Sequence, residues 1–311
     1  MTKPLLSIVT PTYNEIDNIE ELLRRVKTSI AHLDQYDFEF LVIDNCSTDG
    51  TQVKLKELAS QDHRIKVILN ARNFGHIRSP YYGILQSRGE ATIYLASDLQ
   101  DPPEMIPEFI AEWEKGYRLV MAIKPVSKSS PLMHAFRKVY YRFIDRISEV
   151  EIIKDSTGFG LYDKRVLDKL REINDPYPFL RGLICELGYE VKTVPFVQPR
   201  RLRGITKNNF YTLFDIAMLG MVSHSKVPIR IAALVGFLLG FLSILTAFVF
   251  LILKLIFWSS FPMGNAPIVI GLFFLFGVQL FFIGILGEYI GSIHTYVQNR
   301  PIVVEKERIN F

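Results

Sequence analysis

Two long apolar stretches constrain the fold more than any other feature of this 311-residue chain. Residues 231–253 and 266–287 carry no charged side chain over 23 and 22 residues. As helices they would be about 33 to 35 Å long, enough to cross the hydrocarbon core of a bilayer. Two buried helices of a soluble core are the alternative, but such helices are commonly shorter and have polar edges. The sequence therefore predicts a hairpin of two transmembrane helices.

The charges beside these stretches predict an orientation. The segment that joins them, residues 254–265, carries a single lysine. Basic residues stand before the first stretch and after the second: Lys226, Arg230, Arg300, Lys306 and Arg308. Because positive charge tends to stay in the cytoplasm, we expect both termini to be cytoplasmic. The net charge of +4 is modest and gives no indication of nucleic-acid binding.

The first 125 residues alternate between strand-like and helix-like segments. The expected strands are residues 7–10, 38–43, 65–69, 91–96 and 119–123, and the expected helices are 19–30, 51–61, 80–87 and 103–115. Further strands are expected at 158–162 and 189–194. This alternation is typical of an α/β fold with a mostly parallel sheet and helices on both faces. Ligands of such sheets bind beyond the carboxyl ends of the strands.

Acidic residues follow three of these strands: Glu15, Asp44 and Asp98. Such a gathering suits a divalent cation that binds a phosphorylated ligand. Asp98 and Gln100 stand two residues apart, so on an extended segment both side chains project to the same side. Asp101 would then point away or cap the helix that begins at Pro103. A turn rich in helix-capping acids is the alternative interpretation of this stretch.

Three motifs, each after a strand-like segment, carry a family resemblance. They are "TPTYNE" (10–15), "DNCSTDGT" (44–51) and "DLQDPPE" (98–104). As a set they resemble the GT-A fold of the inverting glycosyltransferase family 2. With the two apolar stretches, the whole chain resembles the polyprenyl-phosphate glycosyltransferase branch, which includes dolichyl-phosphate mannose synthases and bactoprenol glucosyltransferases.

The resemblance implies a set of functional residues. A metal ion, Mg²⁺ or Mn²⁺, would be held by Asp98 and Gln100. Catalysis would involve Asp98, Asp155, Arg201 and Lys207, with Asp155 acting as a weak base, orienting the sugar or merely capping a loop. The nucleotide-sugar would be bound by Pro11, Tyr13, Glu15, Asp44, Asn45, Asp98, Lys124, Arg201 and Lys207.

Three positions depart from the family pattern. Asn45 and Ala96 stand where many relatives carry an acid, and Lys124 stands where an arginine is common. The first two changes remove negative charge near the nucleotide, where it would affect the metal affinity and the nucleotide preference. The Asp98–Gln100 pair is retained.

The activity that the resemblance implies is inverting transfer of a hexose, with glucose favoured, from a UDP-sugar to polyprenyl phosphate such as undecaprenyl phosphate. The protein would lie at the bacterial inner membrane. The chain would consist of a catalytic domain (1–208), an interfacial amphipathic segment (209–228), the two transmembrane helices (229–290) and a cytoplasmic tail (291–311). The partners would be the donor, the lipid acceptor and membrane lipids.

Several alternatives remain open on the sequence. The transferred sugar could be mannose or a modified hexose, and the chain could be a non-catalytic sugar-nucleotide-binding subunit. The segment "QPRRL" (198–202) partly resembles the signature of processive polysaccharide synthases, but leucine replaces its tryptophan and two spans are few for a channel. Gly236 and Gly240 form a G-x-x-x-G pair compatible with a homo-oligomer.

Overall fold

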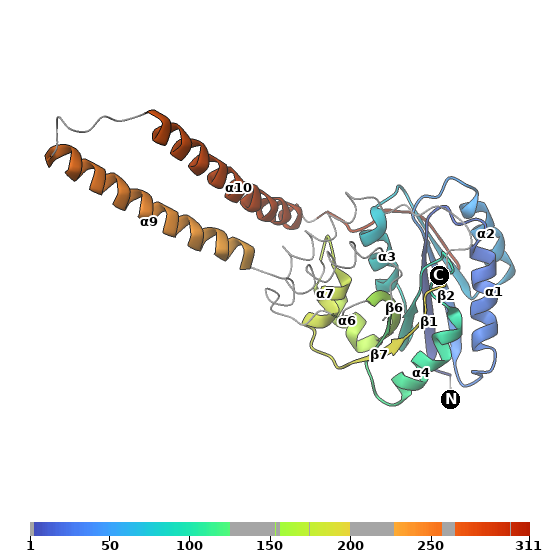
Figure 1. The fold of residues 1–311 in the computed structure, drawn as a ribbon. Coiled ribbons are helices and arrows are strands. Elements are labelled where there is room, and N and C mark those ends of the chain that lie inside the picture. The colour runs from blue at the N-terminus through green and yellow to red at the C-terminus, as the bar shows by residue number, and fades with distance from the viewer. Residues whose placement is uncertain are drawn as a thin grey trace.

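The computed structural model describes residues 3–124, 153, 156–173, 175–199, 227–256, 265–298 and 300–311. Within these residues the chain forms one sheet domain and a pair of long helices that project from it (Figure 1).

A single sheet of eight strands forms the centre of the described domain, in the order β7-β5-β6-β4-β1-β2-β3-β8. Six strands are mutually parallel, while β6 and β8 run antiparallel to their neighbours. The sequence prediction of a mostly parallel sheet is confirmed. The strands are β1 (Leu5–Thr12), β2 (Asp37–Asp44), β3 (Ile65–Asn70), β4 (Ala91–Tyr94), β5 (Leu119–Ile123), β6 (Ser156–Asp163), β7 (Val191–Pro195) and β8 (Glu305–Ile309).

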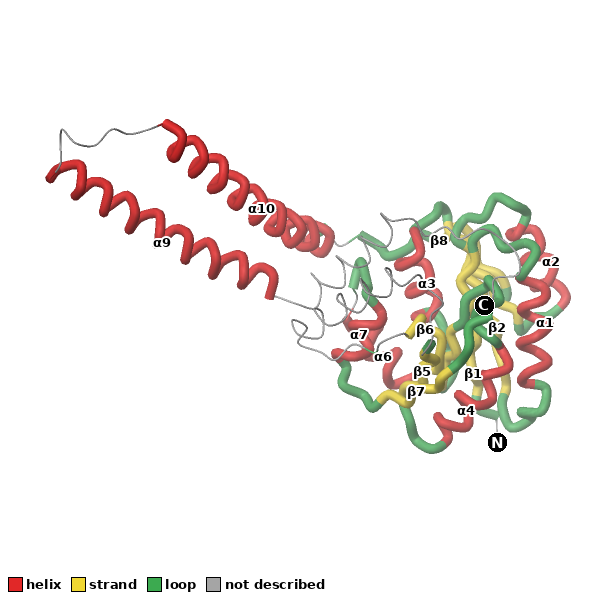
Figure 2. Tube along the Cα trace, viewed as in Figure 1, coloured by secondary structure: helices red, strands yellow, loops and turns green. Residues whose placement is uncertain are grey.

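Helices cover both faces of this sheet, which Figure 2 shows as yellow strands between red helices. One face packs against α1, α2 and α4, and the other against α3, α6 and α7. The described helices are α1 (Ile19–Ile30), α2 (Thr51–Gln61), α3 (Gly75–Leu85), the 3₁₀ turn η1 (Pro103–Met105), α4 (Ile106–Glu114), α6 (Lys164–Ile173), α7 (Leu180–Glu186), α9 (Val227–Ile256) and α10 (Asn265–Val297).

The sequence of β2 explains the two-sided core. Phe40 and Val42 face the α1 side, whereas Leu41 and Ile43 face the α3 side. Successive side chains of a strand point to opposite faces, so a continuous apolar run fills two layers at once. Burying each such side chain contributes about 1.5–3 kcal/mol, and this favours a central position for β2.

The chain returns to the sheet after its last helix. Strand β8 pairs antiparallel with β3, with Asn70 opposite Glu305, and the Ala71 N–H donates to the Val304 carbonyl over 2.9 Å. The sequence predicted only a tail in this region. A strand that follows α10 therefore completes one edge of the sheet.

The two long helices lie side by side (Figure 1), and many of their apolar side chains are exposed. Phe237 of α9 is 80% exposed and Phe281 of α10 is 65% exposed. Among the described residues, one stretch, Phe274–Val297, is long and apolar enough to cross a membrane, and α9 contains a shorter apolar stretch, Val227–Leu242.

Helix α3 begins earlier than expected. The sequence prediction started this helix at Pro80, but the structure starts it at Gly75, whose φ of +87° suits a residue without a side chain. Pro80 then lies inside the helix. This earlier start brings the first turn of α3 to the carboxyl end of β3.

Candidate active site

The carboxyl ends of the parallel strands meet at one edge of the sheet. The pairing register sets Thr12 of β1 opposite Asp44 of β2, and Asp44 opposite Leu69, next to Asn70 at the end of β3. On the other side of β1, strand β4 ends at Tyr94, four residues before Asp98. The strand-end residues picked out in the sequence therefore share one edge.

Three buried oxygen atoms along this edge have no hydrogen-bond partner among the described residues: Thr12 Oγ1, Asp44 Oδ1 and Asn70 Oδ1. The other oxygen of Asp44 is fully used, since it accepts from the Ser47 N–H over 2.9 Å and from Gln52 Nε2 over 2.8 Å. A buried acceptor without a partner costs about 1–3 kcal/mol. A ligand that presents N–H or O–H groups, as a nucleoside does, is chemically complementary to this row.

Asn45 holds the loops after β2 and β3 together. Its Oδ1 accepts from the Phe74 N–H over 2.8 Å, and its Nδ2 donates to Asn73 Oδ1 over 2.9 Å. Asn45 also receives a hydrogen bond from Asn70 Nδ2 over 3.2 Å. The structure thus places Asn45 at the predicted edge, with its amide committed to shaping the loops.

The segment after β1 is fixed against the loop after β2. Asn14 has a φ of +56°, and its Oδ1 accepts from the Thr48 N–H over 2.8 Å. Glu15 is buried and accepts from Asn18 Nδ2 over 2.6 Å at the start of α1. Pro11 lies in β1, and Tyr13 follows that strand with its side chain half-buried.

The Asp98–Gln100 segment is a tight turn, so the expectation of an extended segment was wrong. Leu99 has a φ of +61°, and the Gln100 N–H donates to Asp98 Oδ1 over 3.1 Å. A leucine in this region stores about 1–3 kcal/mol of strain, which is a recurrent feature of functional sites. Gln100 Nε2 faces the Pro199 carbonyl at 3.5 Å. Asp98 Oδ2 and Gln100 Oε1 accept no hydrogen bond from the described residues.

Asp101 folds back into this turn. Its carboxylate is buried and accepts from the Ala96 N–H over 3.0 Å. The prediction that Asp101 points away from the turn or caps the following helix was therefore wrong. Burial, reinforced by the charge of Asp98, raises the pKa of Asp101 to about 6. The raised pKa therefore reflects mainly the burial of this carboxyl, and Asp98 lies close enough to add to it.

Lys124 supplies a positive charge on the β5 side of the same edge. It follows β5 directly, and its Nζ donates to Gln198 Oε1 over 2.9 Å. Its charge opposes the rise in the pKa of Asp101, so the two groups are within electrostatic reach of each other. The structure therefore brings Lys124 within electrostatic reach of the acidic turn, and its role in binding a nucleotide-sugar stays a prediction.

The donor atoms of this turn fit a magnesium-type ion. Asp98 contributes a carboxylate oxygen and Gln100 an amide oxygen, which are hard ligands, and Mg²⁺ usually takes only one or two ligands from the protein. Within the described part of the chain, no group of three or more His, Cys, Asp or Glu side chains comes together as a metal cage. Such an ion would complete its shell with water and ligand phosphate.

Several predicted site residues lie outside the described residues. These are Asp155, Arg201, Lys207 and residues 209–226 of the predicted interfacial segment. The sequence missed Thr12 and Asn70, although Asn70 follows an apolar strand just as Asp44 does. Applying the strand-end argument to amides as well as acids would have found Asn70.

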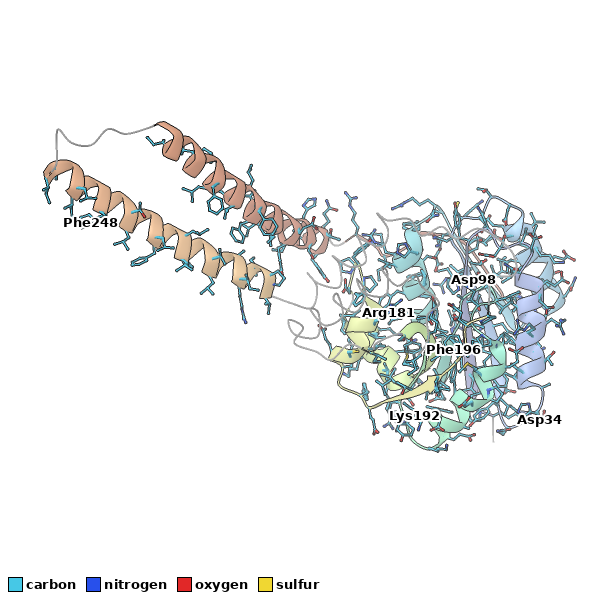
Figure 3. All side chains as sticks on the ribbon, viewed as in Figure 1. Asp34, Asp98, Arg181, Lys192, Phe196 and Phe248 are labelled. Carbon is cyan, nitrogen blue, oxygen red and sulfur yellow. The ribbon has the colours of Figure 1, made fainter. Side chains whose placement is uncertain are left out.

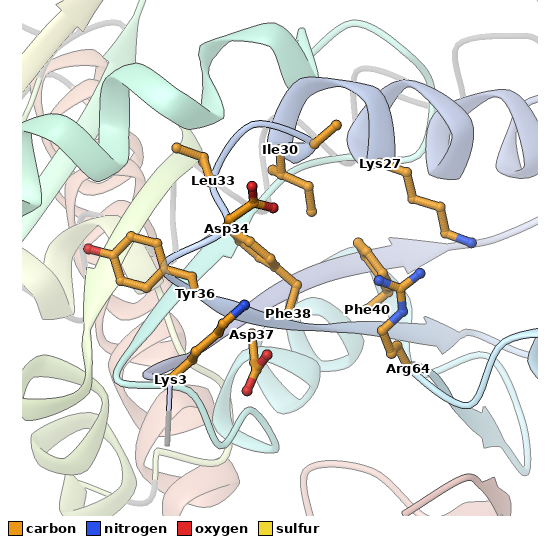
Figure 4. Close-up of a pocket in the computed structure, with 11 residues that line it drawn as sticks. Lys3, Lys27, Ile30, Leu33, Asp34, Tyr36, Asp37, Phe38, Phe40 and Arg64 are labelled. Carbon is orange, nitrogen blue, oxygen red and sulfur yellow. The ribbon is translucent and has the colours of Figure 1, made fainter. Parts of the chain in front are cut away.

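A pocket of about 540 Å³ lies at the opposite end of the sheet, beside the start of β2 (Figure 4). Lys27 and Arg64 lie over the ring of Phe40 there. Both cations are already bound to Asp62, at 2.8 Å and 2.9 Å. Because Lys27 and Arg64 are paired and the pocket is remote from the strand-end acids, this pocket is not the candidate active site.

Comparison with known proteins agrees with this geometry. The profile of the family described as Glycosyl transferase family 2 matches residues 7–171. The chain is 33% identical to the uncharacterized glycosyltransferase sll0501 of Synechocystis sp., over 96% of this chain and 93% of the relative. It is 30% identical to the SfII prophage-derived bactoprenol glucosyl transferase of Shigella flexneri, over 97% of each chain.

Among solved structures, the chain is similar to the mannosyltransferase PcManGT from Pyrobaculum calidifontis in complex with GDP-Man and Mn²⁺. The TM-score is 0.48 at 16% sequence identity, over 96% of this chain and 88% of that one. The sheet, its acidic edge and the sequence similarities together define a glycosyltransferase with a GT-A-like, mostly parallel α/β fold. The chain belongs to glycosyl transferase family 2.

Proposed function

We propose that this glycosyltransferase transfers a hexose, glucose in the first place, from a UDP-sugar to polyprenyl phosphate such as undecaprenyl phosphate. The observation that carries the proposal is the meeting of unpaired strand-end acceptors with the Asp98–Gln100 turn, in a chain that also contains a long apolar helix. The relative from Shigella flexneri, named a bactoprenol glucosyl transferase, supports the choice of acceptor and sugar.

On the donor side, the strand-end row would bind the nucleoside. The unpaired oxygen of Asp44 suits the N–H of a uracil ring, and neighbouring acceptors suit ribose hydroxyls. Pro11 and Tyr13 would frame the base. Lys124, beside the acidic turn, would lie near the sugar-diphosphate.

The leaving group needs electrostatic stabilisation. Breaking the bond between sugar and diphosphate leaves negative charge on the nucleotide. A divalent cation bound by Asp98 and Gln100 would neutralise part of that charge. Arg201 and Lys207 would bind phosphate oxygens, where a guanidinium can donate two parallel hydrogen bonds.

The acceptor needs positioning more than activation. A phosphate monoester is largely ionised near neutral pH because its second pKa is about 6. Held in line behind the anomeric carbon, its oxygen attacks from the face opposite the nucleotide, so an α-linked donor gives a β-linked product. Asp155 would orient the sugar or accept a proton.

The membrane arrangement completes the proposal. α9 and α10 would span the bilayer, with both termini cytoplasmic, residues 209–228 at the interface and the catalytic domain at the cytoplasmic surface. The exposed apolar side chains of both helices support this arrangement, because water-facing helices rarely expose so many. A homo-oligomer through the Gly236 face is part of the same proposal.

The test is direct. The purified full chain is incubated with UDP-[¹⁴C]glucose, Mg²⁺ and undecaprenyl phosphate, and the labelled lipid is extracted. We expect labelled lipid from the wild type, loss of at least 100-fold in Asp98→Ala, and wild-type rates in Asp34→Ala, an exposed acid far from the strand ends. UDP binding without any lipid product would instead favour the non-catalytic binding subunit, and product only from GDP-mannose would change the assigned sugar.

A further inference from the structure

Arg181 of α7 is a half-buried cation, and it has no role in the reaction proposed above. Its guanidinium forms no hydrogen bond or ion pair with any described residue. Two other half-buried arginines have carboxylate partners: Arg118 pairs with Asp163 at 2.8 Å, and Arg171 pairs with Asp168 at 2.5 Å. Holding an unpaired charge at a partly desolvated position costs free energy, so an anionic ligand would find a binding group already in place.

The surroundings of Arg181 place it at the acidic turn. α7 packs on the α3 side of the sheet, in the same core cluster as Tyr94 at the end of β4. Burial raises the pKa of the Tyr94 hydroxyl, Asp101 and Asp98 raise it further, and Arg181 opposes the rise. The Tyr94 hydroxyl is therefore within electrostatic reach of both carboxylates and of the guanidinium.

A contact just before α7 joins this part of the fold to the long helices. The Tyr296 hydroxyl of α10 donates to Asp175 Oδ2 over 3.1 Å, and Asp175 begins the short loop that leads into α7. In Figure 3, Arg181 lies between Asp98 and the near end of α10. A lipid that reaches the acidic turn from the membrane side would pass this position.

We propose that Arg181 binds the phosphate of the lipid acceptor, on the membrane side of the Asp98–Gln100 turn. The inference rests on the proposed function and names a residue that would bind the acceptor. A guanidinium stays charged at neutral pH, and its fork of N–H groups matches phosphate oxygens in bidentate fashion. A cation here also shields the incoming phosphate from the negative charge of Asp98 and Asp101.

The test compares Arg181→Gln and Arg181→Lys with the matched control Arg165→Gln, an exposed arginine on α6. The full chain is reconstituted in lipid nanodiscs, and KM for undecaprenyl phosphate, kcat and the Kd for UDP are measured. We expect Arg181→Gln to raise the acceptor KM by about 10- to 100-fold, as loss of a charge-assisted hydrogen-bond pair predicts. Arg181→Lys should recover part of this loss, while the Kd for UDP stays within twofold and the control is unchanged.

Binding without turnover gives an independent readout. Native mass spectrometry of the protein with undecaprenyl phosphate, in the absence of donor, should show weaker retention of the lipid by folded Arg181→Gln than by the wild type. An unchanged acceptor KM with unchanged retention, or a loss of UDP affinity alone, would overturn the assignment of Arg181. A wild type that retains the lipid through Arg181 but makes no glycolipid would overturn the proposed function and leave the Arg181 assignment standing.

Discussion

Asp44 has two carboxylate oxygens with different roles. One is bound by Ser47 and Gln52, which orient the carboxylate, and the other is buried and unpaired. The first oxygen stabilises the loop after β2, and the second is available to accept a hydrogen bond from a ligand. A substitution that separates the two roles can therefore test nucleotide binding without disrupting the loop.

Asp44→Asn makes this separation. The remaining oxygen of the amide can accept from Ser47 and Gln52, while the amide nitrogen turns an acceptor into a donor at the unpaired position. We expect the Kd for UDP to rise at least tenfold by isothermal titration calorimetry, with little change in the melting temperature. Asp37→Asn, at the exposed start of β2, serves as the control and should bind as the wild type does. Equal affinity of Asp44→Asn and wild type would contradict the role of Asp44.

The sequence predicted some residues of the site and could not predict others. Asp44 and Asp98 were found because acids after apolar strands must meet at one sheet edge. The turn at Leu99 was not, because leucine seldom adopts positive φ and no local pattern indicates it. Arg181 was missed since it reaches the site only through the packing of α7, more than 80 residues after Asp98.

At the scale of elements, Glu39 links three parts of the sheet. It is buried on β2, where it accepts from the Ser7 hydroxyl of β1, from Lys66 Nζ of β3 over 2.6 Å and from the Arg88 N–H over 3.0 Å. Burial alone would raise its pKa, but these hydrogen bonds outweigh burial and lower the pKa below its usual 4.5. The ionised form therefore stabilises the fold.

The stability that Glu39 contributes should depend on pH. A carboxyl with a lowered folded pKa stabilises the protein above its unfolded pKa and loses this contribution as the pH falls through the folded pKa. We expect Glu39→Gln to lower the free energy of unfolding at pH 7 by about 1–3 kcal/mol, and the deficit to shrink below pH 4.5. Chemical unfolding in detergent at both pH values measures it, with exposed Glu108→Gln as the control. A deficit that stays constant with pH would rule out the charge of Glu39 as its cause.

Gly160 allows β5 and β6 to approach closely. A Cβ at this position would lie 2.2 Å from the Val120 carbonyl oxygen, which is backbone and has little room to move. Gly160→Ala should therefore destabilise the protein by about 1–3 kcal/mol or more. The same substitution at Gly277 of α10, where a Cβ meets no atom within 4 Å, should leave the melting temperature unchanged or slightly raised. Equal melting temperatures of Gly160→Ala and wild type would show that the sheet adapts.

Strand β8 shows the limit of prediction from local patterns. Its sequence, EKERI, has one apolar residue, and its partner β3 lies more than 230 residues earlier. Side-chain contacts such as Lys56 with Glu307 at 2.6 Å hold it in place. The central strands were predicted because burial on both faces requires apolar runs, whereas an edge strand has no such requirement.

At the scale of the whole molecule, the contact between Tyr296 and Asp175 joins α10 to the catalytic domain. Asp175 is buried, and its other oxygen accepts from the Tyr177 N–H over 2.8 Å. We expect this contact to limit how the sheet domain tilts relative to the long helices. Under the proposed function, the distance between the acidic turn and a membrane-bound acceptor would depend on that tilt.

Tyr296→Phe removes the hydroxyl that makes this contact. We expect kcat/KM for undecaprenyl phosphate in nanodiscs to fall about two- to tenfold, in keeping with one lost neutral hydrogen bond. The Kd for UDP should not change, because the nucleotide edge is distant from α10. Tyr189→Phe, which lies outside the long helices, should behave as wild type. A Tyr296→Phe enzyme with full activity on the membrane-bound lipid would show that the contact does not control the tilt.

The return of β8 to the sheet makes the order of synthesis matter. A ribosome delivers both long helices before the residues that cover the open edge of β3. The nascent enzyme thus keeps an unpaired strand edge until the helices have left the translation machinery, and a fragment cut before α9 keeps that edge permanently. Such a fragment should be prone to aggregate through β3, so completion of the sheet domain is tied to the synthesis of α9 and α10 ahead of β8.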